Sequence, residues 1–197
     1  MTNSPARPQV ATSYAIGRVR WLAAIGMVGA SIQLAGGVLE TIDRALPDDP
    51  QFVARTAIIG VAYLLFLATL LGLEFSGAAG HRALSHVGLL VAAAGWILYS
   101  AAQFVLSTNF LFAETVLFPT GTILIGVGMT LVGIAALRTR VWAGWRRYIV
   151  LLCGLFPFLA IFPIFALTGG PSFVVLSGWG ACWLALGVAI WMGRSNR

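Results

Sequence analysis

The sequence predicts an all-α fold: a polytopic membrane protein with six transmembrane helices in one bundle and both termini cytoplasmic. Three observations lead to this prediction. Of the 197 residues, 59% are hydrophobic and only 9% are charged, whereas soluble domains carry about 25% charged residues. The apolar residues are gathered in long runs, and six of these runs reach the roughly 20 residues that a helix needs to cross a bilayer. The connections between the runs are short, which leaves no room for a sizeable soluble domain.

The predicted organisation is a single membrane domain between two short tails. Residues 1–17 are polar, include two prolines and are expected to form a flexible cytoplasmic N-terminal tail. Residues 18–193 form the six-helix transmembrane domain, and residues 194–197 form a cytoplasmic tail. The predicted spans are 21–42, 54–73, 86–107, 116–137, 148–168 and 172–192.

The first span carries a stripe of small and polar residues along one helical face. Its members are spaced alternately three and four residues apart: Gly26, Gly29, Gln33, Gly36, Glu40 and Asp43. A helix that faces only lipid has no need for such a stripe. Small residues let another backbone approach closely, and polar residues need partners inside the protein. We therefore expect tight packing at Gly26, Gly29 and Gly36, and we expect this helix to lie at the centre of the bundle.

The third and fourth spans carry polar stripes of their own. The third has Trp96, Tyr99 or Ser100, Gln103 and Ser107, and the fourth has Thr122, Gly126, Thr130 and Gly133. If the stripes face one another, they form an outward-facing polar cleft whose candidate residues are Gln33, Glu40, Gln103, Glu114 and Thr130. We expect Gln33 to point into the bundle and to pair with Gln103 or Thr130, since a lipid-facing amide would stay unpaired.

Two interpretations of this polar cleft remain open. In the structural interpretation, hydrogen bonds between helices hold the bundle together without any ligand, and the carboxylates are solvated at the membrane interface. In the functional interpretation, the cleft is a shallow pocket for a cation, a proton or an amphipathic molecule. The residues alone favour the structural interpretation, because polar side chains in a membrane must be paired in either case.

Prolines interrupt the fourth and fifth spans. Pro119 leaves two starts open for the fourth span: the helix begins at Pro119, or it begins near Phe110 and is kinked. Pro157 and Pro163 each remove a backbone donor and are expected to bend the fifth helix. Such bends usually belong to the architecture of a membrane helix, and a hinge used for gating is the alternative.

Arginine sets the predicted orientation, because all 12 basic residues of the chain are arginine. They concentrate in the N-terminal tail, the second and fourth loops and the C-terminal tail, and only Arg44 and Arg55 lie on the opposite side. By the positive-inside rule both termini are cytoplasmic. An even number of spans independently requires both termini on one side. The predicted location is the cell membrane.

The fourth loop combines arginine with tryptophan and is predicted to lie at the cytoplasmic membrane interface. The residues are Arg138, Arg140, Trp142, Trp145, Arg146 and Arg147. At that level the pattern is typical of an interfacial anchor that contacts anionic lipid headgroups. A nucleic-acid surface is disfavoured, because the arginines lie between apolar runs as topology determinants do. A cytosolic protein partner is a further alternative.

Residues that would carry catalysis or hold a metal do not form a recognisable pattern. The spacing of His81 and His86 does not place two imidazoles on one helical face, and no cysteine lies near them to complete a zinc site. Cys153 and Cys182 both fall in apolar runs and are expected to be free thiols. The chain has no GxSxG elbow and no HExxH helix. We therefore expect no catalytic residue, no metal and no cofactor.

The predicted function follows from this profile. We expect a small integral membrane protein of the binding, accessory or sensor type. The first alternative is a small transporter or channel with a polar cleft around Gln33, Glu40 and Gln103. The second alternative is a lipid-modifying membrane enzyme. The expected partners are the lipid bilayer and either another membrane protein or a second copy of the chain, with no nucleic acid.

Overall fold

The computed structural model describes residues 9–47, 49–80 and 83–193, with side chains from residue 17 onward. Within these ranges the chain is helical and contains no strand. Six helical stretches there are long and apolar enough to cross a membrane: Gly17–Ile42, Phe52–Ser76, Ala83–Leu106, Phe110–Thr139, Arg146–Thr168 and Phe173–Trp191. The predicted six-helix fold class is confirmed.

Four of the six spans are single helices, and the fourth and fifth are composite. The single-helix spans before them are α1 (Gln9–Ile42), α2 (Phe52–Ser76) and α3 (Ala83–Leu106). The fourth span joins α4 (Phe110–Phe112), η1 (Ala113–Leu117) and α5 (Phe118–Thr139). The fifth joins α6 (Arg146–Phe156), η2 (Pro157–Ile161) and α7 (Phe162–Thr168), and the sixth, α8 (Phe173–Trp191), is again one helix, so the single-helix spans number four in all. Because α1 begins at Gln9, helix extends into the predicted tail; residues 1–8 and 194–197 lie outside the described ranges.

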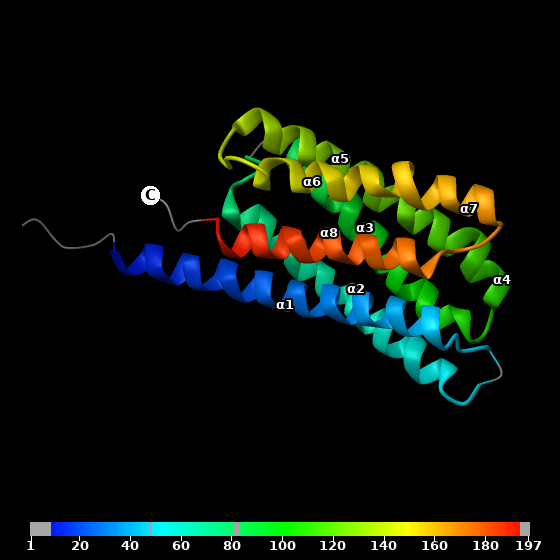
Figure 1. Cartoon of the computed structure of the whole chain (residues 1–197). Helices are drawn as coiled ribbons and strands as arrows, with labels where there is room; N and C mark the ends of the chain where they lie inside the picture. The colour runs from blue at the N-terminus through cyan, green and yellow to red at the C-terminus, as the bar shows by residue number, and fades with distance from the viewer. Residues whose placement is uncertain (1–8, 48, 81–82, 194–197) are drawn as a thin grey trace, which may run out of the picture.

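The helices form two rows of three, with α1, α8 and α6 in one row and α2, α3 and α5 in the other (Figure 1). Each span packs on the next along the chain, and α8 closes the arrangement by packing on α1. The beginning of α1 and the end of α8 lie at the same end of the bundle, which we call the terminal end (Figure 1). The loop end is the opposite one, and it holds the loops 43–51, 107–109 and 169–172.

The first helix does not lie at the centre of the bundle, so that expectation was wrong. It packs on α2 and α8 at the end of a row, and only 33% of its most apolar window is buried, against 56% for the fourth span. The three glycines of its predicted stripe, Gly26, Gly29 and Gly36, all pack on α2. A Cβ atom at Gly29 would lie 2.7 Å from the carbonyl oxygen of Ala62, and one at Gly36 would lie 3.2 Å from Ile59 Cδ1, both on α2.

A second glycine contact, which was not predicted from the sequence, joins α3 to α5. A Cβ atom at Gly88 would lie 2.7 Å from the carbonyl oxygen of Gly128, and one at Gly95 would lie 2.9 Å from that of Gly121. The two glycines on each helix are seven residues apart, which returns them to the same face after two turns. The backbones of α3 and α5 can therefore approach more closely than any side chain would allow.

Aromatic side chains hold the two middle helices, α3 and α8, apart. Trp96 of α3 stacks on Trp179 of α8 with ring centroids 5.3 Å apart, and Trp183 meets Trp96 edge-on at 5.0 Å. Phe66 of α2 stacks on the other side of Trp96 at 4.2 Å. We call these four residues the aromatic plug; all four are fully buried. Because the plug separates them, α3 and α8 make no extended backbone contact in the described part of the chain.

The composite spans contain π-helical turns that precede proline. Phe118 donates its backbone N–H to the carbonyl of Ala113, and Phe162 donates to the carbonyl of Pro157, five residues back in each case. The next residue is Pro119 or Pro163, which has no N–H and whose ring crowds the carbonyl four residues earlier. A wider turn before the proline relieves that crowding. The fourth span therefore begins at Phe110 rather than at Pro119.

Candidate ligand pocket at the loop end of the bundle

A cavity of about 630 Å³ lies between the two helix rows at the loop end. Tyr63 and Tyr99 line it, and both rings also contact Trp96 of the aromatic plug, at 5.5 and 5.8 Å between centroids. The cavity therefore begins directly beside the aromatic plug, on the side of the loop end. All six spans and the first loop contribute to its wall. Pockets for small molecules typically measure about 300–1,000 Å³, so we call this cavity the loop-end pocket.

The wall of the loop-end pocket is mainly apolar. It is formed largely by aromatic and branched side chains, among them Phe52, Ile59, Leu106, Phe110, Phe118, Ile161, Phe162, Phe165, Phe173, Val175 and Leu176. Such a wall accommodates hydrocarbon or aromatic groups and excludes ions that keep their water. The few polar groups in the wall must then set the position of any bound molecule.

Four of the five candidate cleft residues line this one pocket. They are Gln33, Glu40, Gln103 and Glu114, which come from three different spans. Thr130 lies elsewhere: its hydroxyl donates to the carbonyl oxygen of Gly126 at 2.7 Å, within its own helix. The Thr130 side faces α6, where a Cβ atom at Gly154 would lie 2.8 Å from the Thr130 hydroxyl. Gly126, Thr130 and Gly133 of the fourth-span stripe thus pack on the fifth span, and Thr122 is the stripe residue that lines the pocket.

Gln33 points into the bundle, but its partner is not the predicted one. The side chain is 3% exposed, and its Nε2 donates to the backbone carbonyl of Leu176 on α8 at 3.4 Å. Pairing with Gln103 or Thr130 was therefore a wrong expectation. The carbonyl of Leu176 fixes the orientation of the amide, because two oxygens would repel each other. The other end, Oε1, is buried and accepts no hydrogen bond from the described residues.

Two tyrosines bring further polar atoms to the inner part of the pocket. The side chains of Tyr63 and Gln103 interact with each other, and so do those of Tyr99 and Thr122. Gln103 is 9% exposed. Of these four residues and Gln33, only Gln33 has a buried side-chain atom without a hydrogen-bond partner among the described residues.

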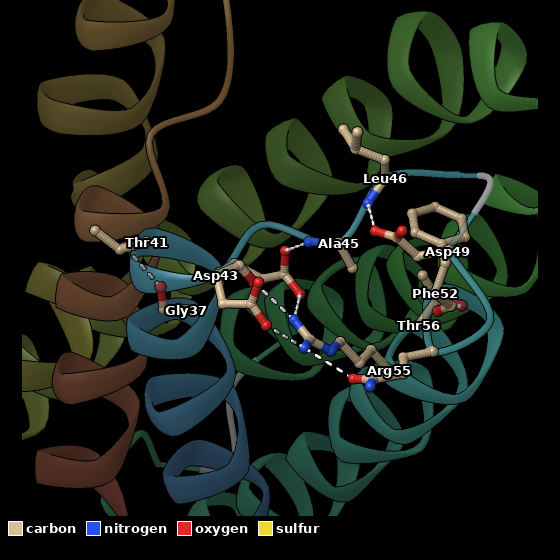
Figure 2. Close-up of polar contacts among 11 residues, drawn as sticks. Gly37, Thr41, Asp43, Ala45, Leu46, Asp49, Phe52, Arg55 and Thr56 are labelled. Atoms are coloured by element: carbon tan, nitrogen blue, oxygen red, sulfur yellow. Dashed lines mark hydrogen bonds and ion pairs between the residues drawn. The ribbon is translucent and has the colours of Figure 1, made fainter.

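Arg55 lies at the rim of the pocket and binds the end of α1 and the first loop; Figure 2 shows these polar contacts. One of its nitrogens, Nη2, lies 2.7 Å from Asp43 Oδ2, and the other, Nη1, donates to the Asp43 carbonyl at 2.7 Å and lies 3.4 Å from Glu40 Oε1. The second oxygen of Glu40 accepts from the backbone N–H of Ala45 at 3.1 Å. The acids at the end of α1 are thus already paired, and together with Arg55 they fix the loop backbone over the pocket.

Arg44 and Glu114 line the same rim without pairing. The guanidinium of Arg44 lies 5.5 Å from the centre of the Phe173 ring, and it interacts with Glu114 only through their opposite charges. Among the described residues, neither side chain makes a hydrogen bond or an ion pair within 4.0 Å. The rim therefore offers one cation and one anion that are free to meet a ligand.

Arg44 and Arg55 were not predicted to line a pocket, because in the sequence they indicated only the orientation of the chain. A signal was present for Arg55. It lies one turn into the second span, opposite the acidic end of the first, and a loop of nine residues brings such groups together. No comparable signal marked the aromatic wall, because phenylalanine is equally common on lipid-facing surfaces.

The basic loop lies at the terminal end, away from the pocket. Arg138, Arg140 and Trp145 are exposed, as an interfacial anchor requires. Arg146 lies 5.5 Å above the Trp142 ring, and Arg147 lies over Tyr148 and donates to its hydroxyl. Trp142 differs from the expectation: it is 4% exposed and packs into the bundle core rather than at the surface.

The remaining candidate groups are dispersed. His86 Nδ1 lies 3.0 Å from Glu74 Oε1, at the terminal end, whereas His81 and Arg82 lie outside the described ranges. Cys153 and Cys182 are free, the first buried and the second half-buried.

Comparison of the chain with protein-family models, curated proteins and solved structures finds no significant match.

Proposed function

We propose that this chain is a multi-pass protein of the cell membrane that binds an amphipathic small molecule in the loop-end pocket, in a binding, accessory or sensor role. One observation carries the proposal: an apolar cavity of about 630 Å³ is walled by all six spans, and its few polar lining residues include Gln33, Gln103, Arg44 and Glu114. A bundle with a purely structural role gains stability by filling such a space, since cavities weaken packing.

The wall and the polar groups together define the kind of molecule. An apolar body fits the aromatic and branched side chains, and a polar or charged head can meet Arg44 and Glu114, which line the same pocket. A hydrated cation or a lone proton would leave most of the wall without a partner. We therefore favour an amphipathic ligand over the other two classes considered for the cleft.

The arginine distribution supports an orientation for this pocket. Ten of the 12 arginines belong to the N-terminal tail, the second and fourth loops and the C-terminal tail, so both termini lie in the cytoplasm in our proposal. The loop-end pocket then opens at the outer face of the membrane. A transporter is the second candidate function, but the aromatic plug closes the way from the pocket to the terminal end. A channel is disfavoured for the same reason, and a transporter would have to move the plug.

The test is binding of a dansyl-labelled long-chain fatty acid to the purified protein in detergent. We expect saturable binding, and we expect Leu176→Trp to weaken it because the larger ring takes up part of the pocket. The matched control is Val174→Trp, two residues away on the same helix, where the side chain is 64% exposed and points away from the pocket. Binding that is equally strong in both variants would mean that the probe sits on the lipid-facing surface, and the proposal would fail.

A further inference from the structure

We propose that the occupant of the loop-end pocket is a phospholipid with a primary-ammonium headgroup, such as phosphatidylethanolamine, taken sideways from the adjacent leaflet. Its phosphate would lie on Arg44 and its ammonium on Glu114, with acyl chain in the apolar part of the pocket. This inference rests on the proposed function, because it names the ligand of the same site.

The wall of the pocket is incomplete at α7. No residue of Phe162–Thr168 is buried, and among the described elements the helix makes extensive contact only with η2 of its own span. Phe162 and Phe165 nevertheless line the pocket, and Phe165 is 43% exposed. One side chain thus belongs both to the pocket wall and to the outer apolar surface. An acyl chain can pass there from the bilayer into the pocket without crossing water.

The charged rim lies at the level of lipid headgroups. Arg44 follows the last residue of α1 by two positions, and Glu114 lies four residues after the start of the fourth span at Phe110. At 1.5 Å per residue, Glu114 is only about 6 Å inside the end of its helix. Both groups are therefore near the interface between hydrocarbon and water, and a lipid can reach them without leaving its leaflet.

The two rim charges select the headgroup chemistry. Arg44 can bind a phosphate through two parallel N–H groups. Glu114 then needs a cationic donor, and a primary ammonium offers three N–H groups, whereas a trimethylated one offers none. A purely anionic headgroup would place its charge near Glu114 and leave that carboxylate unpaired. Arg55 and Glu40 do not compete for the lipid, because they are already bound within the rim.

The experiment is a lipid titration of the purified protein by native mass spectrometry. The probes are phosphatidylethanolamine, phosphatidylcholine and phosphatidylglycerol with identical acyl chains, and the binding lost in Leu176→Trp is counted as pocket binding. We expect phosphatidylethanolamine to bind about tenfold more tightly than phosphatidylglycerol, which corresponds to one charge-assisted hydrogen bond. Glu114→Gln should remove this preference, and Arg44→Gln should weaken all three lipids. Glu74→Gln, at the terminal end, is the control and should change nothing.

The outcomes separate this inference from the proposed function. If binding weakens in Leu176→Trp but the three lipids bind equally, the headgroup inference is wrong and the proposed function stands. If Leu176→Trp retains all lipid and fatty-acid binding, the proposed function itself is wrong. Unchanged thermal unfolding of Glu114→Gln and Arg44→Gln ensures that a lost preference does not reflect a lost fold.

Discussion

Gln33 Nε2 on the first helix lies 3.4 Å from the carbonyl oxygen of Leu176 on the last helix, 143 residues away in the sequence. This bond joins two helices at the wall of the loop-end pocket, yet it uses only one end of the amide. The other end, Oε1, is buried without a partner among the described residues. Gln33 therefore has either a structural role or a binding role, and the substitution Gln33→Leu distinguishes the two.

Gln33→Leu should leave the fold intact and reduce ligand binding. A hydrogen bond between membrane helices contributes on average only about 0.6 kcal/mol, whereas a buried acceptor without a partner costs about 1–3 kcal/mol. The free energy of unfolding should therefore stay the same or rise, while binding of the dansyl-labelled fatty acid weakens. Thermal unfolding and probe titration measure the two effects. Ala35→Leu, exposed on the same helix, is the control; a clear loss of stability in Gln33→Leu would show that the Leu176 bond dominates.

Gly29→Leu should separate α1 from α2. Even a Cβ atom there would lie 2.7 Å from the Ala62 carbonyl oxygen and 2.8 Å from Leu65 Cβ. Overpacking of this kind typically costs about 1–3 kcal/mol, and the expected result is a lower unfolding temperature in detergent. Val28→Leu changes a side chain that is 54% exposed and should be mild. Equal effects from the two substitutions would mean that this face of α1 is not an interface.

Arg55→Gln should loosen the first loop. The substitution removes the contacts with Asp43 and Glu40, and Glu40 then no longer holds the backbone N–H of Ala45 in place. Hydrogen exchange at Ala45 and Leu46, followed by mass spectrometry, should become faster. Arg20→Gln at the terminal end serves as the control. Unchanged exchange at both amides would mean that the contacts of Arg55 drawn in Figure 2 do not hold the first loop in place.

A cysteine at Pro50 should react with a membrane-impermeant thiol reagent in intact cells. Pro50 is exposed in the first loop, which faces outward if both termini are cytoplasmic. Ala143→Cys, exposed in the basic loop at the opposite end, should stay unlabelled until the cells are opened. Replacing Cys182 by serine removes the partly exposed native thiol. The reverse labelling pattern would invert the proposed orientation.

The number of spans could be predicted from the sequence, and the neighbour of each span could not. The length of an apolar run that crosses the membrane is set by the thickness of the bilayer, so it can be counted directly in the sequence. The three-and-four spacing around Gln33 correctly indicated an inward face, but it gives no information on which helix lies opposite. The actual partner is the backbone carbonyl of Leu176. Every residue has such a carbonyl, so the residue types in the sequence could not reveal which one Gln33 binds.

The pocket was predictable in its polar residues and not in its shape. Gln33, Glu40, Gln103 and Glu114 were chosen for polarity in apolar surroundings, and they line one cavity. Thr130 fails because a threonine in a helix can satisfy its hydroxyl on the carbonyl four residues back, as Thr130 does with Gly126. The volume itself depends on how far the stacked Trp96 and Trp179 hold two helices apart, which is a property of the assembled bundle.

The π turns before Pro119 and Pro163 have a consequence for sequence comparison. Each turn accommodates one residue more than a regular helix would in the same rise, so everything after it is rotated by about 100°. A relative that keeps this bundle but lacks either proline would align with this chain only through a one-residue gap within 113–117 or 157–161. Without that gap, an alignment would match Thr122 and Phe165 with residues that point toward lipid, and the pocket would disappear from the comparison although the fold was shared.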